Sequence, residues 1–406
     1  MLMRKRKKIK VRYIFVLLIM VAAVFSFLIY SPESPFTASS GNDDALRQLQ
    51  DNVNDNLNSI DFGDLDNIVG GLTSDDFNMF GGSSFSQKVG QILTGEFASN
   101  YPSIVAAILS LFGGVVLSVI PIIVLIVAVS ALGGFMNALK SEGANGVRDI
   151  IHFVCYAAVI VIVLGAVVDL SNQVGGVLSS IKTQMDIIFP ILLTLMAAIG
   201  GMVSVSVYQP AVLVLSNGVM QIFTYVVMPL FFITLVFSVV GNLSSTTKLD
   251  KFVSFFTSTF KWIIGVVFTV FLAFLTIQGI TAGAHDGVSI RAAKLTISSY
   301  VPFLGGYISQ GFDLVIASSV LVKNAVGVAG LYLLLGVVLL PVIQIVVFML
   351  GLKLAAALTQ PIADPRISNF LTSINKAFGM LVAVLIGVAF MYFITLGLII
   401  MTANVF

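Results

Sequence analysis

Apolar runs of about 20 residues recur along this sequence, and they limit what the chain can fold into. The clearest runs lie at about 150–169, 187–207, 210–241, 262–281, 326–350 and 379–403. About 20 apolar residues in an α-helix cross the hydrocarbon core of a bilayer. Hydrophobic residues make up 58% of the 406-residue chain and charged residues 10%, too apolar a composition for a soluble fold. The sequence therefore predicts an all-α polytopic membrane protein.

The number of membrane helices depends on the run from 103 to 139. Gly113, Gly114 and Pro121 interrupt it, so it forms either one interfacial piece and one span or two tight spans. If this run contributes one span, the six runs above and this span make about seven transmembrane helices. The connectors at 244–262 and 353–379 have sparse charges among apolar residues, a pattern that predicts amphipathic helices at the interface or on the bundle.

The N-terminus, residues 1–40, has the pattern of a secretory signal. Seven positive charges lie in the first twelve residues, and an apolar run of 18 residues follows. Ala38 and Ser40 suit cleavage before residue 41, but the run is also long enough for an uncleaved anchor. Because the basic flank stays in the cytoplasm, both readings place the next segment outside it.

Residues 41–100 form an acidic extracytoplasmic segment. It contains ten acidic side chains and two basic ones, Arg47 and Lys88, so its net charge is −8. Within "DDALRQLQDNVNDNLNSIDF" the apolar residues recur at helical spacing. The segment therefore predicts a short amphipathic helix and a flexible stretch, and not a folded catalytic domain.

An internal repeat emerges when the chain is shifted by 112 residues. The matched pairs are Gly175 and Gly287, Lys182 and Lys294, Pro190 and Pro302, and Pro229 and Pro341. The predicted organisation is a first membrane region at 101–170, a repeat unit at 171–282 and a second unit at 283–406. Three membrane segments in each unit would invert the second copy. The positive bias of 242–261 and 351–378 instead places both connectors on the cytoplasmic side, which weakly favours two units of the same orientation.

Ionisable residues gather between the apolar runs at 284–324. Asp286 precedes a helical pattern and suits an N-cap. Arg291 and Lys294 share one helix face and suit either interfacial anchoring or the lining of a pore or docking surface. Asp313 and Lys323 are costly in lipid, so this part is re-entrant, outside the membrane or shielded within a bundle or an oligomer. The pair "QP" at Gln360 and Pro361, with Pro365 beyond it, ends a helix or forms a gate or partner loop.

The sequence carries no pattern of a catalytic site. His152 and His285 lack the Cys or carboxylate spacing of a metal site, no glycine-rich phosphate loop follows a strand, and the single cysteine, Cys155, lies in an apolar run. We expect a protein that is not an enzyme and that has no cofactor, no bound metal and no nucleic-acid partner.

The blocks "DGVSIRAAKLTISSYVPFLGGYISQGFDLVIASSVLVKNAVGVAGL" and "KLAAALTQPIADPRI" resemble the signature region of the stage III sporulation protein AE family. The resemblance extends from about residue 101 to the C-terminus. It implies an endospore-forming bacterium and a multi-pass protein of the mother-cell membrane around the forespore. It also implies work with other stage III sporulation membrane proteins, among them an ATPase and ring-forming components, and indirectly with stage II sporulation protein Q. The resemblance further implies that these proteins together form a channel that supports late forespore gene expression.

The resemblance brings no catalytic residue to this chain. The candidate pore or partner contacts, from the motif and from the charges above, are Asp286, Gly287, Arg291, Lys294, Pro302, Asp313, Lys323, Asn324, Gln360 and Pro361. Two other functions stay open: a secondary transporter of a small solute, and a passive membrane scaffold for ring proteins. A homo-oligomer is compatible with all three.

Overall fold

A computed structural model describes residues 43–71, 83–95, 101–138, 145–243, 249–282 and 305–402. The described residues form helices, in the order α2 (Asp43–Asn58), α3 (Gly63–Gly71), α4 (Phe85–Thr94), α5 (Tyr101–Ala138), α6 (Asn145–Ala198), α7 (Met202–Leu213), α8 (Met220–Ile222), α9 (Met228–Leu243), α10 (Asp250–Ala282), α12 (Gly305–Thr359) and α13 (Pro365–Met401). Two π-helical segments, η3 (Val214–Val219) and η4 (Phe223–Val227), join α7, α8 and α9 into one rod.

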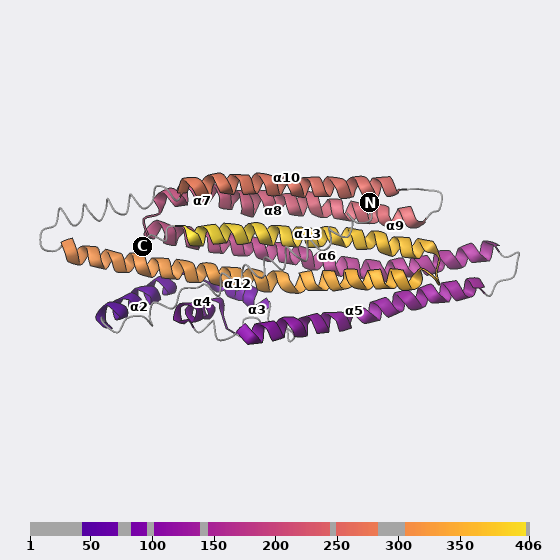
Figure 1. Ribbon diagram of the computed structural model, residues 1–406, viewed down its shortest axis with the longest axis horizontal. Coiled ribbons are helices and arrows are strands. Elements are labelled where there is room, and N and C mark those ends of the chain that lie inside the picture. The colour runs from indigo at the N-terminus through magenta and orange to yellow at the C-terminus, as the bar shows by residue number, and fades with distance from the viewer. Residues whose placement is uncertain are drawn as a thin grey trace, which may run out of the picture.

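The long helices lie side by side in an elongated antiparallel bundle (Figure 1). Helix α12 is its centre, because it contacts α13, α6, α5, α2 and α4. Nearly every side chain from residue 316 to residue 348 is buried or half-buried. Most of the buried side chains are apolar, so packing around α12 dominates the fold.

Six of these helical stretches are long and apolar enough to cross a membrane. They are Ser110–Met136, Phe153–Ala198, Met202–Asn242, Lys251–Ile277, Asp313–Thr359 and Pro365–Met401. The all-α polytopic class is therefore confirmed, with six such stretches among the described residues where the sequence predicts about seven. The difference arises at α6, whose single helix carries the run at 150–169 and most of the run at 187–207.

The predicted span at 187–207 is wrong in its C-terminal part. Helix α6 ends at Ala198, and Gly200 adopts a φ of 94°, which is the left-handed conformation that glycine favours at a helix end. The amide of Gly200 donates to the carbonyl of Ala197, and that of Gly201 donates to Met196, both at 2.9 Å. The chain turns here and returns as α7.

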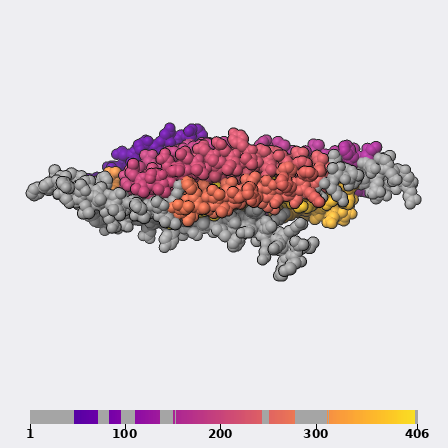
Figure 2. Space-filling view, turned by 90° about the horizontal axis from the view of Figure 1, so that it is seen from above, coloured from indigo at the N-terminus to yellow at the C-terminus, as the bar shows by residue number. Residues whose placement is uncertain are grey.

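The bundle is longer than a bilayer is thick. Helices α6 and α12 contain 54 and 55 residues, which is about 80 Å of helix against about 30 Å of hydrocarbon core. The face formed by α7–α10 (Figure 2) exposes large apolar side chains, among them Tyr225, Trp262 and Val270. Such a face suits contact with lipid, and the remaining length must be tilted, covered or outside the membrane.

The last two helix pairs run in the same direction. The rod from α7 to α9 and helix α12 are parallel, and so are α10 and α13 (Figure 1). Tyr156 fixes this at one end: its hydroxyl donates to the carbonyl of Val239 at 3.0 Å, and its ring packs on Phe370 with centroids 5.5 Å apart. The end of α9 and the start of α13 therefore lie together, as the charge bias predicts. An inverted second unit would separate them.

This arrangement makes a labelling prediction. In a Cys155→Ser chain, Lys251→Cys and Gln360→Cys are expected to react with a membrane-impermeant maleimide from the same side, because both positions are exposed and lie at the same end of the bundle. Asp51→Cys on α2 should react from the other side. Labelling of the first two cysteines from opposite sides would contradict the parallel arrangement.

The acidic segment packs on the bundle. The predicted amphipathic helix is present as α2, with Val53 buried on its inner face, and it contacts α12, as does α4. Ser84 caps α4, accepting from the amide of Gln87 at 3.2 Å, while the side chain of Gln87 accepts from the amide of Ser84 at 3.1 Å. This reciprocal capping box stabilises a helix start.

Candidate functional site

Half of the candidate residues lie outside the described part of the chain. Asp286, Gly287, Arg291, Lys294 and Pro302 fall in 283–304, between α10 and α12. Their roles stay predictions. The other five lie on α12 or directly after it.

Lys323 is fully buried in the first half of α12, which begins at Gly305. Its Nζ donates to the carbonyl oxygen of Thr402 at 2.5 Å, and the hydroxyls of Thr402 and Tyr208 lie 3.0 Å apart. The Thr402 hydroxyl also donates to the carbonyl of Leu398 at 2.7 Å. This network joins α12 to the end of α13 and to α7, and it supplies the hydrogen bonding that a buried ammonium group requires.

Asp313 and Asn324 are half-buried on the same helix. Asp313 and Lys323 are ten residues apart, which is about 15 Å of helical rise, so the two side chains do not pair with each other. The prediction that this region is shielded within the bundle holds for Lys323. The partner of Lys323 in the structure is the C-terminal end of α13.

Gln360 and Pro361 lie at the opposite end of α12 and are exposed. From Lys323 to Gln360 the helix rises about 55 Å. Helix α12 ends at Thr359 and α13 begins at Pro365, with Asp364 as its N-cap, so the double X-Pro break ends a helix as predicted. The described candidates therefore form two separate regions, one in the first half of α12 and one directly after its C-terminal end.

The acidic segment covers the polar region of α12. Asn56 on α2 donates to the hydroxyl of Ser318 at 3.3 Å. On α4, Lys88 is 5% exposed, donates to Gln91 at 3.1 Å and lies over the ring of Tyr332, 5.5 Å from its centroid. Burial lowers the pKa of Lys88 from its ordinary value. These contacts cover this side of α12, a role that the composition of 41–100 did not suggest.

Sequence reasoning also missed polar groups inside the bundle. Gln184 on α6 and the hydroxyl of Tyr392 on α13 are fully buried. Within the described residues, neither these groups nor the Oε1 of Gln344 has a hydrogen-bond partner. Gln344 inside an apolar run was an available signal, but the sequence alone does not say whether it faces inward. Gln184 lies among other polar residues and gave no such signal.

The described residues contain no group of three or more His, Cys, Asp or Glu side chains that could hold a metal ion. One cation and carboxylate meet on α6, where Lys182 and Asp186 form an exposed ion pair at 2.5 Å. A pair of this exposure contributes little to stability.

Comparison with known proteins identifies the family. The model of the stage III sporulation protein AE family matches residues 83–403, which include α4 and all later helices. Stage III sporulation protein AE of Bacillus subtilis (strain 168) is 28% identical over 258 residues, which cover 64% of this chain and 65% of that protein. No solved structure matches. Because the family model covers most of the sequence, the chain belongs to the stage III sporulation protein AE family.

Proposed function

We propose that this protein is an integral membrane component of a channel or export complex that links the mother cell and the forespore and is needed for late forespore development. It acts in the mother-cell membrane around the forespore. The observation that carries the proposal is the family match over residues 83–403. The alignment with the Bacillus subtilis relative spans 65% of that protein.

The burial of α12 supports the proposal. A channel component needs polar groups that are kept away from lipid, since a charge facing hydrocarbon costs about 2.5–3.5 kcal/mol on insertion scales. Helix α12 carries Lys323, Asn324 and Asp313, and neighbouring helices bury or half-bury each of them. Helices α2 and α4 of the segment 41–100 form part of this cover.

The length of the bundle also supports a place in a larger assembly. About 80 Å of helix in α6 and α12 exceeds the hydrocarbon core by about 50 Å. Protein beyond the bilayer offers a surface to the proposed partners, the other stage III sporulation membrane proteins with their ATPase and ring-forming components. The association with stage II sporulation protein Q is indirect, through these partners.

A secondary transporter fits the sequence less well. Under the 112-residue shift, the positions that correspond to Asp313 and Lys323 in the first unit are Gly201 and Ala211. A transporter built from two equivalent units would place ionisable residues near the centre of both. A passive scaffold makes a different prediction, because it should tolerate apolar residues along the polar part of α12.

The test is complementation in an endospore-forming host that lacks its own copy of the gene. The double variant Asp313→Leu, Asn324→Leu is expected to reach normal abundance in the membrane and to arrest after engulfment, with few heat-resistant spores. A matched control, Thr269→Leu with Thr276→Leu, changes two exposed positions on the outer face of α10. The control should give wild-type spore numbers.

The abundance of the protein in the membrane and the number of spores are measured separately. A wild-type spore number from the Asp313, Asn324 variant at normal abundance would contradict the channel proposal and leave the scaffold ahead. If that variant is not retained in the membrane, the polar pair Asp313→Asn, Asn324→Gln is used instead. It removes the charge of residue 313 and moves the amide of residue 324 by one methylene group, and both side chains stay polar. Spore numbers from this second pair then decide between the channel proposal and the scaffold.

A further inference from the structure

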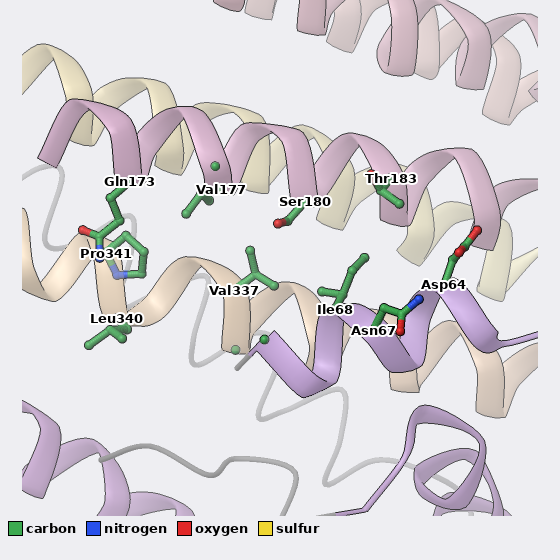
Figure 3. A pocket seen from close by; sticks show the side chains of 13 residues that line it. Asp64, Asn67, Ile68, Gln173, Val177, Ser180, Thr183, Val337, Leu340 and Pro341 are labelled. Carbon is green, nitrogen blue, oxygen red and sulfur yellow. The ribbon is translucent and has the colours of Figure 1, made fainter. Parts of the chain in front are cut away.

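A cavity of about 710 Å³ lies between α3, α6 and α12 (Figure 3). Polar side chains gather at its two ends, and apolar side chains together with Ser180 lie between them. None of the five candidate residues that the structure describes lines it. It is therefore separate from the network around Lys323.

Asp64, Asn67 and Thr183 form one end of the cavity (Figure 3). Among the described residues that line the cavity, Asp64 is the one ionisable side chain. It belongs to the segment 41–100, whose net charge is −8. This end therefore offers a carboxylate and two neutral hydrogen-bonding groups to a cation.

The other end is formed by Gln173 and Pro341 (Figure 3). The Oε1 atom of Gln173 is buried and has no hydrogen-bond partner within the described residues. Pro341 lies inside α12 and has no N–H to donate to the carbonyl of Val337 one turn before it. This end therefore offers two acceptors, a side-chain amide oxygen and a main-chain carbonyl.

Ile68, Val177 and Val337 lie between the two ends. Gln173 and Thr183 are ten residues apart on α6, so the two polar ends are separated by about 15 Å. A ligand that satisfies both must be long and thin, with an apolar middle and a donor at each end. The acidic end requires one of these donors to be a cation.

We propose that this cavity binds a linear aliphatic diamine. One ammonium group lies against Asp64, with Asn67 and Thr183 beside it, and the methylene chain packs on Val177 and Val337. The second ammonium group donates to the Oε1 of Gln173 and to the Val337 carbonyl. Alkyl ammonium groups resemble the lysine side chain, whose ordinary pKa is about 10.4, so both ends are charged at neutral pH.

Calorimetric titration of the full chain in a neutral detergent, with diaminodecane as the probe, tests this directly. Saturable binding at one site is expected. Gly176 lines the cavity, and a Cβ there meets nothing within 4 Å, so Gly176→Leu should fill the space without a backbone clash and abolish binding. Asp64→Asn should weaken binding roughly tenfold through loss of the charge-assisted contact.

The matched control is Gly175→Leu, which also meets nothing within 4 Å at its Cβ but does not line the cavity. It should bind diaminodecane as the wild type does. Gln173→Leu should weaken the binding of diaminodecane and leave that of the shorter diaminobutane unchanged, because the short chain cannot reach both ends. Absence of saturable binding, equal loss in both glycine variants, or wild-type affinity in Asp64→Asn would each overturn the proposal.

Discussion

A single methyl group at position 134 is expected to lower the free energy of unfolding by about 2–3 kcal/mol. In the structure, a Cβ on Gly134 would lie 3.0 Å from the carbonyl carbon of Ile362 and closer still to its oxygen. These are main-chain atoms of the turn between α12 and α13. A rotamer change cannot relieve the contact, so α5 or the turn must move. The thermal midpoint of Gly134→Ala in detergent measures the cost.

The control for Gly134→Ala changes the same residue type on a helix with free space. Gly165 on α6 is exposed, and a Cβ there meets nothing within 4 Å. Gly165→Ala should raise stability by up to about 1 kcal/mol, because alanine is the better helix former. Equal midpoints for the two alanine variants would show that α5 and the turn do not approach as closely as described.

Lys323→Glu is expected to destabilise the protein by about 3–5 kcal/mol and to reduce its abundance in the membrane. The substitution replaces a buried donor with a buried carboxylate that faces the carbonyl oxygen of Thr402. Neither partner can then donate, and both are shielded from water. Abundance on an immunoblot and the thermal midpoint of whatever protein is recovered are the measurements.

Lys323→Met separates the charge from the volume at the same position. Methionine keeps much of the side-chain length and leaves behind a neutral carbonyl, so the loss should stay below about 2 kcal/mol. A Lys323→Glu protein as stable and abundant as Lys323→Met would contradict the Thr402 contact. Normal spore numbers from Lys323→Met would limit the role of Lys323 to packing the end of α13.

The apolar runs predicted the long helices well, but they could not place the helix ends. Pro361 and Pro365 interrupt the chain visibly, and the structure divides α12 from α13 at this point. The polar residues at 171–186 suggested a boundary that does not exist, because α6 passes through them as one helix. Some of these polar side chains lie on the surface of the helix, as Asp186 does, and others, such as Gln184, are buried in the bundle. Composition alone does not distinguish the two cases.

The candidate site was predicted in part. The cost of a charge in lipid indicated that Lys323 must be shielded, and it is buried. Its contact with Thr402 was not predictable, because the partner is a main-chain carbonyl 79 residues away and carries no signal in the sequence. The cavity between α3, α6 and α12 depends on three helices far apart in the chain, so no local pattern marks it.

The contact between Asn56 and Ser318 joins residues that are 262 positions apart, and this separation sets an order of assembly. Helices α2 and α4 are synthesised before any of the long helices, yet their docking surface on α12 is among the last to be made. Contacts of such long sequence separation form late in folding. Helices α2 and α4 can therefore dock only after α12 has been made and inserted. Until they dock, the part of α12 that they cover is open on that side.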